Sequence, residues 1–395
     1  MAGSQTALRE ANRATVLDTI RRYGGLTQVE LAAATSLSAA TVSSIVRELQ
    51  GAGAVDVRTT VRNGRRALLV TVLHRTGLVV GVRIGTRHMA MTLADSAQEV
   101  LVEQTLPLPH EHRADTSLDR AALLIVELLE RVGSSPEELL GIGIGVPAPV
   151  DVATGTISVP GILRGWDDVP VGEVMSRRLG VPVFVDNDAN LGALAESRLG
   201  AARHFQDSVY VRVSHGTGAG VVLGHQLHRG FAGTAGEIGH VQVDASGAVC
   251  LCGSRGCLNT VVGVPALIDV LRASRGPLSL RDIVTLASEG DPGCRQVVED
   301  AGATIGGVVA ALAISVNPQC VVVGGELAET GETLLAPLRE AIRRRVPLNH
   351  IAPLEVVGAE LGARAEVMGA VLLALEGTTL LTHRVDHPDR DRVPG

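Results

Sequence analysis

The sequence predicts an α/β protein in which a small basic N-terminal domain is followed by a duplicated, two-lobed α/β body. Three observations support this fold class: helical segments and a hairpin in order at the start of the chain, an α/β pattern that occurs twice in the remainder, and a compact Cys/His motif. A chain of 395 residues is long for one core. Its 46% hydrophobic and 2% aromatic residues indicate a globular interior of Val, Leu, Ile and Ala.

Charge separates the two parts of the chain. All 35 basic residues are arginines, and residues 1–75 hold ten of them against five acidic residues, a balance of +5. The whole chain carries −7, so residues 76–395 carry −12. A basic head on an acidic body indicates that the head alone meets a polyanion.

The head begins with three predicted helices. Apolar residues recur at helical spacing over residues 12–23 and stop at a Gly-Gly pair. Thr27 caps a second helix over residues 28–34, and Ser38 caps a third. The third helix has one apolar stripe and a small, polar and basic outer face, which suits entry into a DNA major groove. The side chains that we expect to contact DNA from it are Thr41, Ser43, Ser44 and Arg47.

A hairpin follows these helices. Residues 55–72 alternate apolar and polar residues around Arg62-Asn63-Gly64-Arg65-Arg66, and Asn-Gly is the strongest short hairpin signal. Arg62, Arg65 and Arg66 at the tip suit the minor groove or the DNA backbone. An ordinary three-helix bundle is the alternative. The order of three helices and an arginine-tipped hairpin on the basic segment favours an N-terminal winged helix-turn-helix DNA-binding domain over residues 1–75.

The acidic body repeats one α/β unit. The order strand, strand, strand, helix, strand occurs twice, and two such lobes would face each other across a cleft. The first copy is expected as strands at 78–84, 89–94, 100–106 and 140–146 with a helix at 117–132; the second has strands at 208–213, 219–223, 240–243 and 320–323 with a helix at 294–316. We predict a first lobe over residues 76–185, a second lobe over residues 186–377 and a flexible tail over residues 378–395.

The sequence predicts a soluble, cytoplasmic protein that is associated with the nucleoid when it binds DNA, with no membrane partner. The N-terminus is polar and does not resemble a signal peptide. Residues 301–325 are uncharged and long enough to resemble a membrane span. Asn317-Pro318 divides them, so we expect a buried helix and strand.

His240, Cys250, Cys252 and Cys257 form a candidate metal site. The cysteines lie in the run Cys-Leu-Cys-Gly-Ser-Arg-Gly-Cys, ten residues after the histidine. Three thiolates and one imidazole complete a tetrahedral ligand set for structural Zn2+ and leave no open position for a catalytic water. The glycines within the run let the loop fold back. A disulfide is the alternative, but it is rare in the reducing cytoplasm.

Two glycine-rich turns lie where a nucleotide would bind such a body. Gly216, Thr217 and Gly218 join two predicted strands, and their amides suit phosphate oxygens. Gly324-Gly325 ends another strand. A glycine hairpin alone is more often an ordinary turn. Together with the duplication, these turns point to the superfamily of sugar kinases, heat-shock proteins and actin, an actin-like, sugar-kinase-like (ribonuclease H-like) fold.

The chain resembles the ROK family (repressors, open reading frames and kinases), in particular its transcriptional regulators of the xylose- and N-acetylglucosamine-repressor type. The resemblance covers about residues 9–376. It rests on Phe184-Val185-Asp186-Asn187-Asp188-Ala189-Asn190, on Gly236-Glu237-Ile238-Gly239-His240 and on Gly256-Cys257-Leu258 at the end of the metal loop. The second and third motifs in this order are highly specific.

The resemblance implies a sugar pocket. Asn187, Asp188, Glu237 and His240 would line it, with Asp188 in the place of the general base that activates a sugar hydroxyl for phosphorylation. Zinc would hold His240 through one ring nitrogen and leave the other for a hydroxyl. Asn259 belongs to the same set but departs from the glutamate that the family usually has there, which removes one charge-assisted bond.

A second departure concerns catalysis. Family kinases have Asp-x-Gly-Gly-Thr where this chain has Arg83-Ile84-Gly85-Thr86-Arg87, so a guanidinium replaces a carboxylate that helps to hold the metal-bound nucleotide. We therefore expect no enzyme activity. If the chain were a kinase, Asp188 would be its base.

The sequence as a whole predicts a sugar-responsive transcriptional repressor of carbohydrate uptake and metabolism genes. Its head would bind double-stranded, palindromic operator DNA, and its body would form a homodimer or homotetramer and respond to a sugar or sugar phosphate. Two alternatives remain: a bifunctional ROK sugar kinase, and a regulator whose body senses a protein partner instead of a sugar.

Overall fold

The computed structural model of the chain describes residues 9, 12–17, 19, 20, 23, 25–51, 54–62, 65–72, 77–109, 111–159, 162–346 and 353–386. These residues form two compact units. Unit 1 consists of residues 1–79 and 93–101, and unit 2 consists of residues 80–92 and 102–395. The predicted head, residues 1–75, thus lies within unit 1, and most of the predicted body forms unit 2.

Unit 1 contains the predicted three helices and hairpin. Its described residues between 12 and 23 are helical, and they precede a three-stranded sheet of order β1-β3-β2. Helices α2 and α3 cross at 115°, as in a helix-turn-helix. The elements are β1 (Leu26–Thr27), α2 (Gln28–Thr35), α3 (Ala39–Gly51), β2 (Val55–Arg62) and β3 (Arg65–Val72).

Local hydrogen bonds explain where the helices of the head begin. The Glu30 amide donates to Thr27 Oγ1 at 3.3 Å while the Thr27 amide donates to the Glu30 carboxylate at 2.7 Å, which is a capping box. The Thr41 amide donates to Ser38 Oγ at 3.1 Å. Both predicted caps are therefore present. The buried core of the head is formed by Val16, Ile20, Leu31, Val42, Ile45, Val46, Leu49, Val55 and Val70.

The wing hairpin is also present. β2 and β3 pair antiparallel, from Val55 opposite Val72 to Arg62 opposite Arg65. The Asn63-Gly64 turn and the side chains of the three tip arginines lie outside the described residues. The register leaves two residues between the strands, as the Asn-Gly signal predicts.

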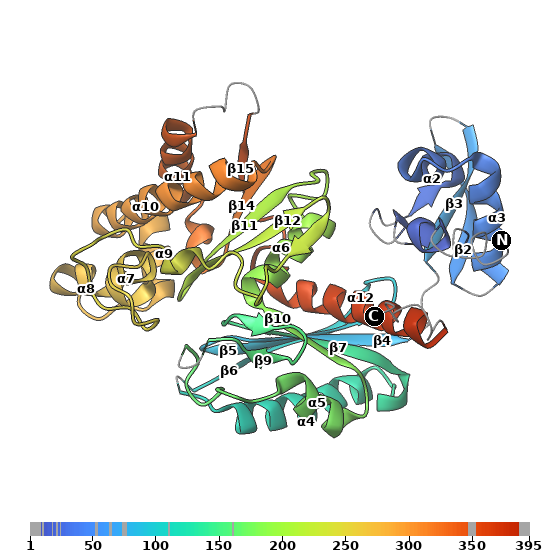
Figure 1. Cartoon of the computed structure of the whole chain (residues 1–395), viewed down its shortest axis with the longest axis horizontal. Helices are drawn as coiled ribbons and strands as arrows, with labels where there is room; N and C mark the ends of the chain where they lie inside the picture. Colours follow the sequence, from blue (N-terminus) through green and yellow to red (C-terminus); the bar gives the residue numbers. More distant parts are fainter. Residues whose placement is uncertain are drawn as a thin grey trace, which may run out of the picture. The chain divides into compact units, whose positions relative to one another are not determined.

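The first lobe contains a five-stranded sheet of order β10-β7-β4-β5-β6. Helices α4 and α5 cover its outer face (Figure 1). A two-stranded ribbon, β8-β9, follows the fourth strand. The elements are β4 (Leu78–Ile84), β5 (His88–Asp95), β6 (Val100–Pro107), α4 (Ala114–Arg131), η1 (Pro136–Glu138), β7 (Leu139–Val146), β8 (Val150–Asp151), β9 (Thr156–Ile157), α5 (Val171–Leu179), β10 (Val183–Asn187) and α6 (Asp188–Arg198).

The second lobe repeats this topology. Its sheet has the order β13-β12-β11-β14-β15, so the first strand is central, the second and third lie on one side, and the fourth and fifth lie on the other. The elements are β11 (Ser208–Val213), β12 (Thr217–Leu223), β13 (Gln226–His228), η2 (Ile238–His240), α7 (Asn259–Val262), α8 (Val264–Arg275), α9 (Leu280–Ser288), α10 (Pro292–Val316), β14 (Cys320–Gly324), η3 (Glu326–Thr330), α11 (Glu332–Arg345), β15 (Glu355–Gly358), η4 (Gly362–Arg364) and α12 (Ala365–Asp386).

One sequence prediction for the second lobe was wrong in detail. The third strand is β13, whereas His240 ends a 3-10 turn and the residues after it make one isolated bridge, from Gln242 to Cys257. Metal-loop residues occupy that bridge, so the apolar alternation there serves the loop. The chain is helical from Ala365 as far as Asp386, and no proline occurs in this helix before Pro388.

Helices α6 and α12 lie between the two sheets (Figure 1). Glycines permit the close contacts: a Cβ on Gly369 of α12 would lie 2.0 Å from the Leu191 carbonyl oxygen of α6, and a Cβ on Gly143 of β7 would lie 1.9 Å from the Ala370 carbonyl oxygen. Side chains at these positions would separate the helices from each other and from the first sheet. The lobes therefore meet through backbone-to-backbone packing.

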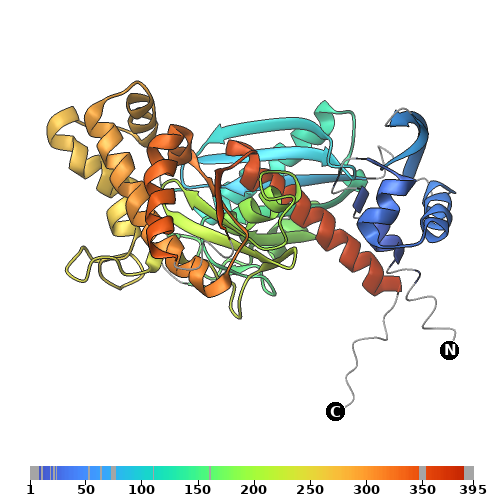
Figure 2. The ribbon, with the colours of Figure 1, turned by 90° about the horizontal axis from the view of Figure 1, so that it is seen from above.

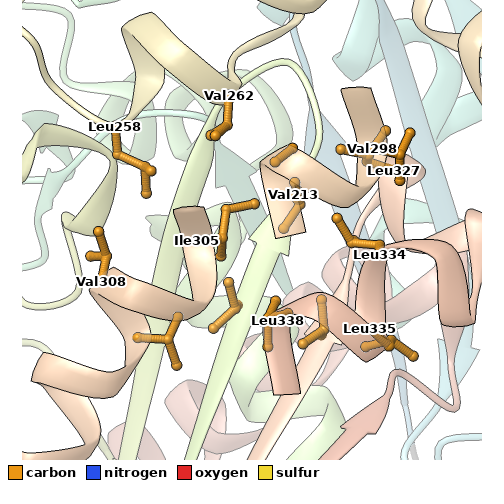
Figure 3. Packing of buried hydrophobic residues seen from close by; sticks show 14 of the residues in the cluster. Val213, Leu258, Val262, Val298, Ile305, Val308, Leu327, Leu334, Leu335 and Leu338 are labelled. Atoms are coloured by element: carbon orange, nitrogen blue, oxygen red, sulfur yellow. The ribbon is translucent and has the colours of Figure 1, made fainter. Parts of the chain in front are cut away.

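The largest core covers the other face of the second sheet. Helices α10 and α11 pack side by side there (Figure 2). Figure 3 shows Val213 of β11, Ile305 of α10 and Leu338 of α11 in this core, together with Leu258 and Val262 at the end of the metal loop. The metal loop is thus anchored in the core of the second lobe.

Helix α10 accounts for the apolar segment noted in the sequence. Among the described residues, α10 is the one helix that is long and apolar enough to cross a membrane. The bent pair of α2 and α3 meets the same criteria of length and composition when the two helices are taken together. Half of the apolar window of α10 is buried inside the protein, and Asn317 ends the helix in a left-handed conformation. The predicted helix and strand are confirmed as α10 and β14.

Candidate functional site

The outer face of α3 carries the predicted DNA contacts. Thr41, Ser43 and Ser44 are half-buried, Arg47 is exposed, and the Arg47 Nε–H donates to the Ser43 carbonyl oxygen at 3.3 Å. The opposite face is the apolar stripe of the head core, in which Val42 and Leu49 are fully buried. Helix α3 thus packs against the core of the head through its apolar face, and its polar face is directed away from that core.

Four ligand atoms converge in the metal loop. The candidate donor atoms of His240, Cys250, Cys252 and Cys257 all lie within 4.8 Å of one another. His240 Nδ1 lies 3.6 Å from Cys250 Sγ, and Cys252 Sγ lies 3.7 Å from Cys257 Sγ. These residues form one candidate metal site, and the donor set of one imidazole and three thiols fits tetrahedral Zn2+.

The glycines of the loop have the predicted role. Gly253 and Gly256 have φ of +86° and +65°, a region that side-chain-bearing residues rarely adopt. A Cβ on Gly256 would lie 1.5 Å from the Asp244 carbonyl oxygen, and the Gly256 amide donates to the Ala248 carbonyl oxygen at 2.8 Å. Tight backbone folding thus brings the three sulfurs together.

His240 links the metal site to the predicted sugar site. Its Nδ1 faces Cys250, while its Nε2 lies 3.8 Å from the Glu237 carboxylate. Burial, followed by the charge of Asp188, raises the pKa of Glu237 to about 7. A metal ion held through Nδ1 would therefore fix the imidazole beside the Glu237 carboxyl group, whose pKa the charge of Asp188 also raises.

Asn187 and Asp188 begin α6 directly after β10. Asn187 is the N-cap, and its side-chain oxygen accepts hydrogen bonds from the Ala189 and Asn190 amides at 2.8 and 3.3 Å. The Asp188 side chain is almost fully buried, and burial raises its pKa although the charges of Arg212 and Arg83 oppose this. The sequence motif thus presents a buried carboxyl group at a helix N-terminus, and burial outweighs the neighbouring positive charges in its effect on the pKa.

Asp186 in the same motif has a different role. Its buried carboxylate accepts hydrogen bonds from Asn190 Nδ2 at 2.9 Å and from Arg229 Nε at 2.7 Å. Arg229 follows β13 in the second lobe, so this ion pair joins the start of α6 to the segment that leads to Glu237. The sequence predictions did not include Arg229.

Asn259 supports the glycine-rich turn. Its side-chain oxygen accepts a hydrogen bond from the Thr217 amide at 2.8 Å, and a Cβ on Gly239 would lie 2.4 Å from Asn259 Nδ2. Gly216 lies in the turn, and Gly218 on β12 pairs with Arg212. Asn259 is therefore adjacent to the predicted nucleotide-like loop as well as to the metal loop.

Two charged residues that sequence reasoning missed, Arg212 and Glu366, lie beside Asp188. Arg212 Nε donates to the Glu366 carboxylate at 2.9 Å and lies 3.4 Å from Asp188 Oδ2. Arg83 Nε lies 4.0 Å from the other Glu366 oxygen. Each of these four side chains is at most 17% exposed. Arg212 and Glu366 stand outside recognisable motifs, so local sequence contains no signal for them.

Buried polar atoms that make no hydrogen bond gather at this junction between the lobes, and two of them, Asp188 Oδ2 and Arg83 Nε, take part in the ion pairs described above. Within the described ranges, seven buried side-chain atoms make no hydrogen bond, and all except Ser134 Oγ belong to the junction. These atoms are Arg83 Nε, Asp188 Oδ2, Asn190 Oδ1, Tyr210 OH, Ser214 Oγ and Thr217 Oγ1. Buried polar groups are normally satisfied, so such a concentration favours a polar ligand.

Comparisons with known proteins agree with this architecture. The ROK family model matches residues 79–377, which is most of the chain. The chain belongs to the ROK family. The MarR family model matches residues 10–66, so this ROK protein is a transcriptional regulator with a MarR-like winged head. The predicted fold class, a winged helix-turn-helix followed by a two-lobed sugar-kinase fold, is confirmed.

The ROK regulator is similar to named repressors over nearly its whole length. It is 32% identical over 403 residues to the DNA-binding transcriptional dual regulator NagC of Escherichia coli strain K12, covering 98% of each chain. It is 29% identical over 389 residues to the xylose repressor of Caldicellulosiruptor bescii, covering 94% of this chain and 97% of that chain. A solved ROK family transcriptional regulator, a homologue of the Escherichia coli MLC protein, matches it with a TM-score of 0.78 and 26% identity over 96% of this chain and 99% of that chain.

Proposed function

We propose that this ROK regulator is a sugar-responsive transcriptional repressor of carbohydrate uptake and metabolism genes. The observation that supports this function most directly is the presence, in one chain, of a head with an exposed recognition face and a ROK body with a polar, unsatisfied junction. The similarity to a xylose repressor and to NagC supports the same function. Such a protein acts in the cytoplasm, on the nucleoid.

The head would bind double-stranded, palindromic operator DNA. Thr41, Ser43, Ser44 and Arg47 of α3 would read the major groove, and Arg62, Arg65 and Arg66 of the wing would contact the minor groove or the backbone. A homodimer or homotetramer would place the two heads of a pair one helical turn, or a multiple, apart.

The body would bind a sugar or sugar phosphate. Asn187, Asp188, Glu237, His240 and Asn259 would contact its hydroxyls, since carboxylates and amides are natural partners of vicinal hydroxyls. Asp188 Oδ2 has spare hydrogen-bonding capacity for such a hydroxyl. The ligand must bind one arrangement of the protein better than the other, because only differential affinity shifts the equilibrium.

The metal would be structural Zn2+. His240, Cys250, Cys252 and Cys257 supply a closed set of four ligands, which leaves no position for a metal-bound water. Zinc on Nδ1 would hold the His240 ring with Nε2 directed toward the ligand site.

Kinase activity is not part of the proposal. The residues at the junction do not fit a magnesium-bound nucleotide, because Arg83 and Arg212 place two guanidinium groups beside the only carboxylates of the cluster, Asp188 and Glu366. Gly216 lies in the turn after β11, whereas Thr217 and Gly218 belong to β12, where Gly218 pairs with Arg212. The relatives reported above, which match 94% or more of this chain, are transcription regulators.

Selection of genomic DNA fragments by the purified protein, followed by sequencing, tests the DNA function. We expect one recurring palindrome near sugar-uptake genes. Arg47→Ala would relax base preference at one position, whereas Arg65→Ala would weaken binding to all sequences alike and lower its salt dependence. Random fragments with native affinity in both variants would contradict the assignment of the DNA-binding face.

A thermal-shift screen with a panel of sugars and sugar phosphates tests the ligand function. A ligand that binds the native state raises the melting temperature, and Asp188→Asn should remove most of that shift. Sugar-dependent ATP turnover that Asp188→Asn abolishes would instead support the bifunctional kinase.

One observation favours a second candidate, a body that senses a protein partner. The Asn259 side-chain oxygen is already engaged by the Thr217 amide, so it offers less to a sugar than a free acid would. No shift with any sugar, together with loss of operator binding on addition of a purified transport component, would favour this candidate.

A further inference from the structure

The four charged residues at the lobe junction follow the internal duplication of the fold. Arg83 is the penultimate residue of β4, the first strand of its sheet, and Arg212 is the penultimate residue of β11, the first strand of the other sheet. Asp188 begins α6, which follows the fifth strand of the first sheet, and Glu366 lies in the first turn of α12, which follows the fifth strand of the second. The cluster therefore consists of two equivalent Arg/acid pairs.

The four side chains come from four successive layers. The first sheet supplies Arg83, α12 supplies Glu366, α6 supplies Asp188 and the second sheet supplies Arg212. Arg212 is shared by both carboxylates, at 2.9 Å to Glu366 and 3.4 Å to Asp188, whereas Arg83 is 4.0 Å from Glu366. The charges thus form one contiguous group across the junction.

Charge balance explains why two arginines are needed. Two buried carboxylates beside Arg212 alone would leave one negative charge without a partner, and an unpaired buried charge is strongly destabilising. The N-termini of α6 and α12 favour the carboxylates but supply only a partial positive charge. With Arg83 the cluster has two positive and two negative charges.

Other charged or titratable groups near the cluster do not replace Arg83. Tyr210 and His215 on and after β11 and Glu237 lie within electrostatic reach of its members, and Arg87 and Glu326 act on His215. Burial lowers the pKa of His215, which favours its neutral form. Of these groups Arg87 is the one additional guanidinium, and its side chain is exposed.

We propose that Arg83 is an internal cation that completes the charge of the lobe junction and thereby determines that this site takes no metal ion. The sign of the charge at position 83 then decides whether the junction binds a metal ion. A guanidinium there neutralises the two carboxylates, whereas a carboxylate there would let the junction bind a divalent cation. This goes beyond the loss of a kinase residue, because it assigns Arg83 a positive role in holding the two lobes together.

Arg83→Asp tests the proposal directly. The variant would have three carboxylates facing Arg212, and we expect Mg2+ alone to raise its melting temperature by on the order of 5 °C at saturation. The native protein should show no shift with Mg2+. Arg198→Asp is the matched control, because Arg198 is similarly buried, at 19% exposed, and pairs with Glu376 at 3.2 Å away from the cluster. Its melting temperature should not respond to Mg2+.

A second set of variants keeps the test valid if Arg83→Asp does not fold. Arg83→Met removes the cation without adding a charge, and Glu366→Gln removes one carboxylate. We expect Arg83→Met to lower the melting temperature by roughly 5 °C or more, and the double variant to recover part of that loss, because a cluster with one acid and Arg212 is again balanced.

Three results would overturn the proposal: an Arg83→Asp protein that folds and does not respond to Mg2+, a native protein that does respond, or additive effects of Arg83→Met and Glu366→Gln. None of these readouts involves DNA or a sugar. Failure here would therefore leave the proposed DNA and sugar binding untouched, and failure of operator or sugar binding would leave this inference standing.

Discussion

The two lobes share one topology but differ in the connection between their third and fourth strands. In the first lobe this connection, from β6 to β7, contains α4 and one 3-10 turn. In the second lobe, from β13 to β14, it contains the metal loop and helices α7 to α10. The strand order is the same in both sheets. The metal loop therefore lies in a connection that can lengthen without changing the order of the strands in the sheet.

The connections nevertheless perform one common task. His112, between β6 and α4, faces the Gly85 carbonyl oxygen with Nε2 at 3.0 Å and so holds the turn after β4. Asn259, at the end of the metal loop, accepts the Thr217 amide at 2.8 Å and so holds the turn after β11. In each lobe, a residue in the connection between the third and fourth strands thus holds the turn between the first two strands. This residue is His112 in the first lobe and Asn259 in the second.

The largest difference between the lobes should appear on loss of the metal. Cys257→Ser removes one of four ligands from the connection of the second lobe. We expect loss of stoichiometric zinc by elemental analysis and a decrease of at least about 3 kcal/mol in the free energy of unfolding, because the binding energy of a structural metal contributes to folding.

Ser254→Ala is the control for this prediction. Ser254 is exposed in the same loop, and its carbonyl rather than its hydroxyl accepts the Cys250 amide. This variant should retain its metal and its stability. A Cys257→Ser protein with native zinc content would mean that the loop binds its metal differently.

The contact between the lobes should be nearly as sensitive. In Gly369→Ala the new Cβ would lie 2.0 Å from the Leu191 carbonyl oxygen, and backbone cannot move aside as a flexible side chain can. We expect a loss of about 3 kcal/mol by denaturant unfolding. In Gly307→Ala, also in a helix, the nearest atom is 3.5 Å away, and we expect a gain of about 0.5–1 kcal/mol. Equal effects of the two changes would contradict the packing argument.

A smaller effect should follow from restoring an acid in the second lobe. Asn259→Glu can still accept the Thr217 amide and adds a charge-assisted acceptor beside the proposed sugar site. For a sugar identified in the thermal-shift screen, we expect about fivefold tighter binding by calorimetry. Unchanged affinity would favour the protein-partner candidate, since Asn259 would then not face a sugar.

The smallest expected effect concerns pH and the first lobe. Burial lowers the pKa of His112 below its ordinary value. As the pH falls below about 6.5, the unfolded chain takes up a proton at this residue before the folded protein does, so the free energy of unfolding decreases. His112→Gln should flatten the stability profile between about pH 7 and pH 5. A profile that the substitution does not change would assign the pH dependence to other groups.

The sequence predicted most of the fold because its signals are local. Caps at Thr27 and Ser38, the hairpin register and the long helix α10 each depend on neighbouring residues, and all are present. The error at residues 240–243 has the same origin. Alternating apolar residues there pair with the end of the metal loop, at Gln242 and Cys257, and local alternation does not reveal which partner a segment will have.

By itself the sequence determined the order of the modules, the four candidate metal ligands and the family, because the four ligand residues lie 2 to 17 positions apart along the chain and glycines at two turns let their loop bring them together. Only the tertiary structure decided the charge cluster. Arg83 and Glu366 are separated by nearly the whole body in sequence, and they meet because duplicated strands and helices place equivalent residues at one junction. Buried charges interact through space, where no motif records their pairing.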